Sequence, residues 1–395
     1  HEWGHYLHHR LASCGMPQCA AMSEGWADFV ALHMAMQPGD NLDGTFALAQ
    51  YATAGSSDAF FGLRRAPYAL DTAKNGFTFK HIADGAELPA IPLRTTGGPN
   101  SEVHNAGEIW AEWLFEAYVA LLKTTQVANP TRTFDQVRRA MGDYIVAGLE
   151  MTPPDATFTE QRDAVLTAAA AVSDADAAVM AAAFARRGGG SCAQSPPRTS
   201  SSFVGVVEDF ALAPAVTITD AKLDETIKSC DQDGVLDRGE AGRLTMTVHN
   251  SGAATLTGAT LLPTTTTAGV TLPTAPIVVP DIAPFQSATI AFDVSLGVDI
   301  APQANLQVAL AVNAPGACSP SSTIAFTQQV NLDLSVASSA TDHVETQGTE
   351  WTLTGANATD IWARVTSDAG SRVWHTVDFP SLSDNALVSP DLMVS

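Results

Sequence analysis

The spacing of apolar residues along the chain changes near residue 190. Before that point they recur every three to four residues, as at Ile109, Trp113 and Tyr118, which is typical of one face of a helix. The pattern predicts helices over residues 23–32, 108–122, 134–149 and 159–172. An alanine-rich stretch at 164–185 is interrupted by charge and indicates two helices that meet near Ser173.

After residue 190 the period becomes two. Leu244, Met246 and Val248 alternate with polar residues, and so do the apolar residues of 290–296 and 306–312. Short strands between turns rich in proline and glycine are typical of an immunoglobulin-like β-sandwich. We divide the chain into a helical domain at 1–187, a linker at 188–202, a β-sandwich at 203–331 and the start of a further β domain at 332–395, which carries Trp351, Trp362 and Trp374.

Candidate chemistry lies at the start of the helical part, in His1-Glu2-Trp3-Gly4-His5. Two histidines four residues apart on a helix project from one face, so both imidazoles can bind one Zn²⁺. Glu2 lies between them and is offset around the helix, where it can act as a general base toward water. The alternative is a chance match in a surface helix.

Glu24 is the predicted third zinc ligand, on a helix that begins at Ser23 as its N-cap. Three protein ligands leave one zinc position open, which is the mark of a catalytic site. Asp28 lies one turn after Glu24 and shares its face. We expect its carboxylate to accept the other ring N–H of His1 or His5 and so to orient that imidazole.

His-Glu-x-x-His followed by Glu-x-x-x-Asp resembles the gluzincin metalloproteases, the thermolysin-like group. Four segments, in this order and spacing, are similar to the fungalysin family: 23–28 (SEGWAD), 62–68 (GLRRAPY), 103–111 (VHNAGEIWA) and 183–188 (AFARRG). The resemblance covers residues 1 to about 190, nearly half of the chain. It implies the helical C-terminal half of a thermolysin-like catalytic domain.

The resemblance also implies roles for particular residues. His1, His5 and Glu24 match the zinc ligands, Glu2 matches the base that activates water, and His104 matches the histidine that stabilises the oxyanion. A donor aimed at developing charge in a dry cleft suits that role. Taken alone, without the resemblance, His104 is more often a structural histidine.

Arg64 matches an arginine that hydrogen-bonds the substrate backbone, and its planar fork suits a carbonyl. Either the adjacent Arg65 exchanges roles with it, or Arg64 forms a structural ion pair.

Two parts of the family pattern are missing. Thermolysin-like enzymes place a tyrosine shortly before the third ligand as a second oxyanion donor, and here that stretch, 14–19, has none. Tyr6 and Tyr68 are candidate substitutes. The chain also begins on a metal ligand, without the family's pro-segment and the β-rich half of the catalytic domain. We therefore expect an internal fragment that is inactive on its own, because positioning of the peptide accounts for much of catalysis.

Composition fits a secreted protein. The net charge is −22, with 20 Lys and Arg, so nucleic acid and anionic membrane surfaces are not the expected partners. No apolar run in the sequence is long enough to span a membrane. Close spacing predicts a Cys14–Cys19 disulfide. Cys230 and Cys318 flank the strands of the sandwich and are predicted to pair, with Cys192 left over.

Alternating carboxylates with a turn glycine occur in the second domain, at Asp231, Asp233, Asp237 and Glu240. They indicate either a calcium loop, without the full twelve-residue EF-hand pattern, or a plain acidic turn that leads into a strand.

Two classes of function remain. The first is a secreted zinc-dependent metalloendopeptidase that hydrolyses proteins and peptides; the second is a catalytically inactive protease-like domain that serves as a binding or adhesion module. The complete set of His1, Glu2, His5, Glu24 and His104 favours the first. We find no motif for capture of a free amine, which an aminopeptidase requires.

Overall fold

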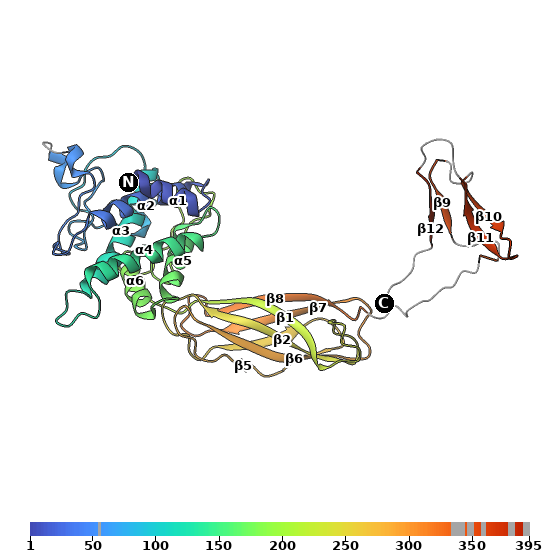
Figure 1. Cartoon of the computed structure of the whole chain (residues 1–395). Coiled ribbons are helices and arrows are strands. Elements are labelled where there is room, and N and C mark those ends of the chain that lie inside the picture. Colours follow the sequence, from blue (N-terminus) through green and yellow to red (C-terminus); the bar gives the residue numbers. More distant parts are fainter. Residues whose placement is uncertain (54–56, 333–343, 346–350, 357–360, 378–383, 390–395) are drawn as a thin grey trace.

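The computed structural model describes residues 1–53, 57–332, 344–345, 351–356, 361–377 and 384–389. Helices occupy the first half and antiparallel strands the second, so the predicted order of a helical protease-like domain followed by β domains is confirmed (Figure 1). None of the helices in these ranges is long and apolar enough to cross a membrane.

The helices of the first domain are α1 (Glu2–Leu11), α2 (Pro17–Ala35), α3 (Val103–Lys123), α4 (Phe134–Glu150), α5 (Phe158–Ala170) and α6 (Asp174–Arg186), with short 3₁₀ helices at Gln50–Thr53, Ser57–Phe60 and Phe79–Ile82. The last three agree with the predicted helices to within a turn, whereas α3 begins at Val103, before the predicted start at 108. Ser173 caps α6 by accepting from Asp176 N–H. The second helix was predicted too short. It begins at Pro17, so Ser23 is a buried residue inside α2 and not its N-cap.

The helix α3 is the centre of the first core. It is buried over most of its length and packs against α2 on one side and α6 on another. Its close approach to α2 depends on glycine: a Cβ on Gly25 would lie 2.3 Å from the carbonyl oxygen of Gly107. In the same way a Cβ on Gly4 would lie 2.5 Å from the Cα of Ala27. These two contacts bring α1, α2 and α3 together at backbone distance, and all the predicted site residues of the domain except Arg64 lie on these helices or at the N-cap of α1.

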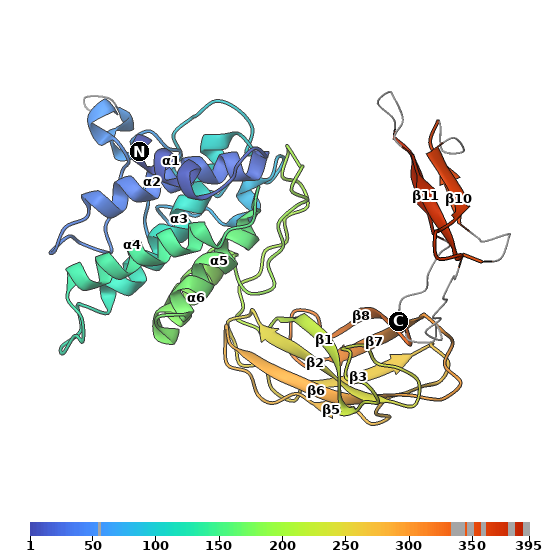
Figure 2. The ribbon, with the colours of Figure 1, turned by 45° about the vertical axis from the view of Figure 1, so that its right-hand side comes forward.

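The β-sandwich has two four-stranded sheets, in the orders β1-β2-β6-β4 and β5-β3-β7-β8 (Figure 2). The strands are β1 (Val216–Lys228), β2 (Ala241–Asn250), β3 (Thr260–Thr265), β4 (Val270–Thr271), β5 (Ile277–Val278), β6 (Ser287–Leu296), β7 (Ala304–Asn313) and β8 (Ser321–Val330). The predicted alternating residues of β2, β6 and β7 face a second hydrophobic core. Beyond the sandwich, β9 (Thr352–Thr354) pairs with β12 (Ala386–Val388), and β10 (Trp362–Thr366) with β11 (Arg372–Thr376).

Residues 188–215 join the two domains and run along the helical layer before β1 begins at Val216. Phe203 is fully buried in the helical core, and the Gln18 amide donates to the carbonyl oxygens of Pro196 and Pro197. From the sandwich, Phe285 packs into the same core. The domain boundaries at 187 and 203 remain predictions, and part of the segment predicted from residue 332 onward lies outside the described residues.

The disulfides are Cys14–Cys19, as predicted, and Cys192–Cys318. The predicted Cys230–Cys318 pair is wrong, and Cys230 is a free, exposed cysteine. Cys318 lies beside the start of β1, where its N–H donates to the carbonyl of Pro214. Cys230 follows the other end of this 13-residue strand. At about 3.3 Å per residue the two ends are about 40 Å apart, far beyond the reach of a disulfide.

Candidate metal centre

Three side chains converge at the N-terminal end of α1. His1 Nε2 lies 3.2 Å from His5 Nε2 and 3.4 Å from Glu24 Oε2, and His5 Nε2 lies 3.5 Å from Glu24 Oε1. Tetrahedral Zn²⁺ with bonds of about 2.0–2.1 Å requires ligand atoms about 3.3–3.4 Å apart. The two contacts to Glu24 end on different oxygens of its carboxylate, and all three distances are close to the edge of a zinc coordination tetrahedron.

The outer nitrogens of the two imidazoles face partners on α2. His1 Nδ1 lies 2.8 Å from Asp28 Oδ1, and His5 Nδ1 lies 2.9 Å from Ser23 Oγ. With a proton on each Nδ1, both Nε2 atoms present lone pairs to the same space as the Glu24 carboxylate. Two imidazole nitrogens and a carboxylate that face one space are a donor set that fits a divalent metal ion.

Charge in the cluster affects both histidines and the carboxylate. The contact with Asp28, followed by that with Glu24, raises the pKa of His1 to about 9, whereas burial lowers the pKa of His5. Burial alone would raise the pKa of Glu24, but the hydrogen bond with His1 and the nearby cationic groups lower it. Because a bound metal requires neutral imidazoles, metal binding here would displace the proton of His1.

Glu2 and His104 line the same cavity, which has a volume of about 420 Å³. Its other lining residues are His1, Ala31, Leu48, Ala49, Tyr51, Leu63 and Arg64. His104 Nε2 lies 3.4 Å from Glu24 Oε2 on the metal side. The structure therefore brings together the predicted ligands, the predicted base and the predicted oxyanion histidine, although their roles remain predictions.

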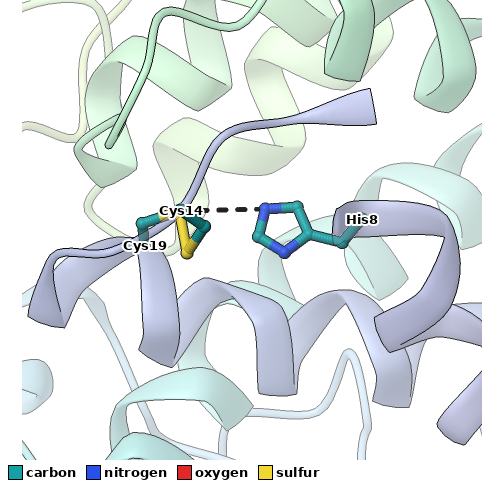
Figure 3. Close-up of side chains that lie close together, drawn as sticks. All are labelled: His8, Cys14 and Cys19. Atoms are coloured by element: carbon teal, nitrogen blue, oxygen red, sulfur yellow. Dashed lines mark hydrogen bonds between the residues drawn. A yellow bond between two sulfur atoms is a disulfide. The ribbon is translucent and has the colours of Figure 1, made fainter. Parts of the chain in front are cut away.

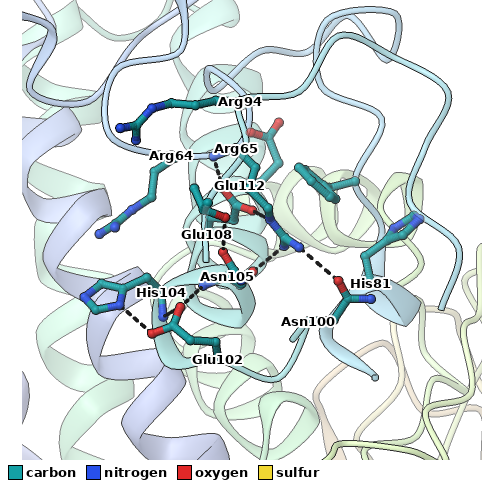
Figure 4. Close-up of polar contacts among 12 residues, drawn as sticks. Arg64, Arg65, His81, Arg94, Asn100, Glu102, His104, Asn105, Glu108 and Glu112 are labelled. Carbon is teal, nitrogen blue, oxygen red and sulfur yellow. Dashed lines mark hydrogen bonds and ion pairs between the residues drawn. The ribbon is translucent and has the colours of Figure 1, made fainter. Parts of the chain in front are cut away.

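His104 has a carboxylate partner that the sequence analysis missed. Its Nδ1 lies 2.7 Å from Glu102 Oε1 (Figure 4). Glu102 is also the N-cap of α3 and accepts from the backbone N–H groups of His104 and Asn105. One side chain thus fixes both the start of the helix and the ring that it carries. A carboxylate two residues before the histidine, at a helix start, is the sequence signal for this contact.

Arg64 is buried beside the metal centre and forms a bidentate pair with Asp28. Its Nε donates to Oδ2 at 2.5 Å and its Nη2 to Oδ1 at 2.7 Å. Tyr68 O–H donates to the same Oδ2 at 2.6 Å. Asp28 therefore connects His1, Arg64 and Tyr68, and the Tyr68 hydroxyl is engaged there. Tyr6, the other predicted substitute for the missing tyrosine, is exposed on α1.

Arg65 points the opposite way, into the core. It pairs with Glu108 through its guanidinium and its backbone N–H, and it donates to Asn100 and to the carbonyl of Asn105 (Figure 4). Arg64 lines the cavity beside the metal centre, whereas Arg65 is not among the residues that line it. The substrate role of Arg64 remains a prediction.

A second group of potential ligands lies at the other end of α1. His8 is fully buried and its Nε2 is 3.9 Å from Cys19 Sγ (Figure 3). Both sulfur atoms of this group, from Cys14 and Cys19, are joined in the disulfide. Here the disulfide links the loop after α1 to the first turns of α2, and so it fixes the two ligand-bearing helices to each other.

The predicted calcium residues divide into two pairs. Asp231 and Asp233 are exposed and gather with Glu225, which the sequence analysis missed. Asp237 and Glu240 are buried, and the Glu240 carboxylate accepts from the backbone N–H groups of Cys230 and Asp237. This carboxylate supports the turn before β2, and calcium binding remains a prediction.

The helical fold and the convergence of His1, His5 and Glu24 are those expected of a metallopeptidase of the His-Glu-x-x-His type. Residues 1–193 match the fungalysin metallopeptidase (M36) family, and this part of the chain belongs to that family. The family is one of metal-dependent peptidases, which agrees with the donor set.

Curated relatives match the same region. The chain is similar to extracellular metalloproteinase 9 of Uncinocarpus reesii (26% identical over 183 residues, 42% of this chain and 26% of the relative). It is also similar to extracellular metalloproteinase mep of Aspergillus fumigatus (26% over 186 residues, 44% and 26%) and to extracellular metalloproteinase 3 of Trichophyton tonsurans (27% over 189 residues, 44% and 26%). The matched region spans about a quarter of the length of these relatives.

Proposed function

We propose that the protein to which this chain belongs is a secreted zinc-dependent endopeptidase that hydrolyses peptide bonds in proteins. The observation that carries the proposal is the convergence of His1 Nε2, His5 Nε2 and the Glu24 carboxylate, with contacts of 3.2–3.5 Å between them. Secretion is supported by the relatives named extracellular metalloproteinases. A zinc ion held by His1, His5 and Glu24 would supply Lewis acidity, which would make water nucleophilic at neutral pH and polarise the scissile carbonyl.

Glu2 supplies the proton transfers. It lies on the exposed face of α1 between the two imidazoles and lines the cavity with His1 and His104. A carboxylate there accepts a proton from the attacking water and then passes it to the leaving amine. Both steps need Glu2 beside the metal and not bound to it, which its position between the ligands permits.

His104 and Arg64 hold the substrate. Glu102 holds the His104 ring through Nδ1, so Nε2 is placed to donate to a developing oxyanion. A preorganised donor of this kind contributes about 3–4 kcal/mol to catalysis. Arg64 lines the cavity while Asp28 fixes its guanidinium, so it can hold a substrate carbonyl in a constant position.

Zinc binding and cleavage test the proposal in separate steps. The 395-residue chain should bind one equivalent of Zn²⁺ in a competition titration with a chromophoric chelator, and Glu24→Gln should weaken that binding. Glu2→Gln should bind zinc as the unchanged chain does. An exposed glutamate at the end of α4, changed as Glu150→Gln, is the control.

Cleavage belongs to the full-length secreted protein, because the matched region covers a quarter of its relatives. There Glu2→Gln should abolish chelator-sensitive cleavage of casein, while Glu150→Gln should not. Loss of zinc binding in the unchanged chain would contradict the proposal altogether. Zinc binding without peptide cleavage in the full-length protein would favour the inactive binding module instead.

A further inference from the structure

The two zinc-ligand imidazoles have different partners on α2. Asp28, a carboxylate, faces His1, whereas His5 Nδ1 meets the hydroxyl of Ser23 at 2.9 Å. Ser23 Oγ lies 3.2 Å from Nε2 of a further histidine, His9. Ser23 is only 3% exposed, so its hydroxyl bonds within this cluster and not to bulk water.

The three groups form a chain whose direction matters. A serine hydroxyl has one proton to donate and can accept another. When it donates to His9 Nε2, it is left to accept from His5 Nδ1–H. His5 Nε2 then carries a lone pair and points at His1 Nε2, 3.2 Å away. In the reverse direction the proton would sit on His5 Nε2 and block it as a ligand.

Helix geometry places all three groups together. His5 and His9 are one turn apart on α1, and their rings are stacked with centroids 6.4 Å apart. Ser23 approaches both of them from α2, one residue before Glu24. The same turn of α2 thus supplies a metal ligand and the group that orients a second one.

We propose that Ser23 and His9 are positioning residues for the metal site: the hydroxyl, directed by His9, selects the tautomer of His5 that presents Nε2 to zinc. The inference rests on the proposed zinc function. Ser23 acts on His5 as Asp28 acts on His1. His9 acts only through Ser23, so its effect depends on the hydroxyl being present.

Zinc affinity of the 395-residue chain at fixed pH is the first measurement. Ser23→Ala should weaken zinc binding by about 10–100-fold, as loss of an orienting partner does. His9→Ala should give a smaller loss and add nothing to Ser23→Ala, because the two residues act as one unit. The β-sandwich offers a matched control: His249 Nδ1 lies 2.9 Å from Ser287 Oγ, and Ser287→Ala and His249→Ala should leave affinity unchanged.

A second measurement separates orientation from packing. In the metal-free chain, ¹⁵N ring shifts of His5 should report a proton on Nδ1, and Ser23→Ala should mix the two tautomers. His9→Gln keeps an acceptor near the position of Nε2 and should restore affinity relative to His9→Ala. Ser23→Thr keeps the hydroxyl and should restore it relative to Ser23→Ala.

The outcomes are distinct. If the unchanged chain binds no zinc, the proposed function fails before this inference is reached. If it binds zinc and Ser23→Ala binds equally well, the inference is overturned and the proposed function stands. Additive losses in the double variant, or an unchanged His5 tautomer in Ser23→Ala, would also overturn it. Should Ser23→Thr misfold, the His9 variants and the ring shifts still decide.

Discussion

Asp28→Asn is the substitution with the sharpest expected outcome. The carboxylate is fully buried and has four contacts: two from Arg64, one from the Tyr68 hydroxyl and one with His1. Burial alone would raise the pKa of Asp28, but the contacts with His1 and Arg64 lower it, so the group is ionised at neutral pH. Asparagine keeps the shape, removes the charge and turns one acceptor into a donor that faces other donors.

The expected cost follows from the partner that is left behind. Without Asp28, the buried Arg64 guanidinium loses its bidentate partner and keeps a longer contact with Glu24, at 3.5 Å from Nη2. Breaking a buried ion pair by removing one partner costs about 3–5 kcal/mol. The free energy of unfolding of a domain is about 5–15 kcal/mol, so the variant should still fold if the unchanged domain lies in the upper part of this range. It should then unfold at a much lower urea concentration than the unchanged chain. Zinc affinity should fall by about 10–100-fold, because His1 Nδ1 then faces a neutral amide and not a carboxylate.

Urea unfolding followed by tryptophan fluorescence measures this cost in the right domain. Trp26, Trp110 and Trp113 are buried in the helical core and should give the largest change on unfolding. The sandwich strands contain no tryptophan, and Trp351, Trp362 and Trp374 beyond them are only partly buried. The control is Asp43→Asn, whose carboxylate is 75% exposed and pairs with Lys123 at 2.6 Å. That surface pair should contribute less than about 1 kcal/mol. Equal losses of stability in the two variants would refute the argument that Asp28 compensates a buried charge.

Three further predictions concern the helices and the domain junction. Burial lowers the pKa of His8 to about 4, whereas the same histidine in the unfolded chain binds a proton near pH 6.5. The free energy of unfolding should therefore fall by up to about 3 kcal/mol as the pH is lowered from about 6.5 to 4. In His8→Gln, the urea midpoint should no longer depend on pH in this range. Gly4→Ala should weaken zinc binding in the chelator titration although every predicted ligand remains, because the new Cβ would lie 2.5 Å from the α2 backbone. Gly15→Ala is the control and should leave zinc binding unchanged, because its Cβ would have its nearest neighbour at 3.6 Å. Replacing Cys192 and Cys318 by serine removes a disulfide that closes a loop of 126 residues. In the chain-entropy model this disulfide contributes about 4–5 kcal/mol to stability. The replacement should lower the calorimetric unfolding temperature under oxidising conditions and leave it unchanged under reducing conditions.

Periodicity was enough to predict most of the fold. The apolar stripe around Trp110 and Trp113 became the central helix, and the alternating residues of β2, β6 and β7 became the core of the sandwich. Cysteine pairing was not predictable in this way. Cys192 reaches Cys318 because the segment after α6 returns along the helical layer to the start of β1, and no local pattern encodes that path.

The site was predictable where it depends on a single helix. The spacing of His1 and His5 follows from one turn of α1, and Glu24 was found from its own motif. What faces those residues from other elements was harder to predict. Arg64 and Tyr68 meet Asp28 only because a loop crosses over α2, so the sequence alone left open both a substrate role for Arg64 and an oxyanion role for Tyr68.

Ser23 was missed for a more specific reason, which concerns where α2 begins. Taken as an N-cap, Ser23 would have used its hydroxyl on the backbone of its own helix. Pro17 at the first helical position was the available signal for an earlier start. If α2 begins at Pro17, the connection from α1 is short and the two helices run antiparallel. In an antiparallel pair, a residue further along α1 faces one earlier in α2, so the two residue numbers have a nearly constant sum. His1 faces Asp28, His5 faces Ser23 and His8 faces Cys19. The register of the two helices therefore predicts Ser23 as the partner of His5. This prediction was not reached from the sequence because the start of α2 was placed at Ser23 and not at Pro17.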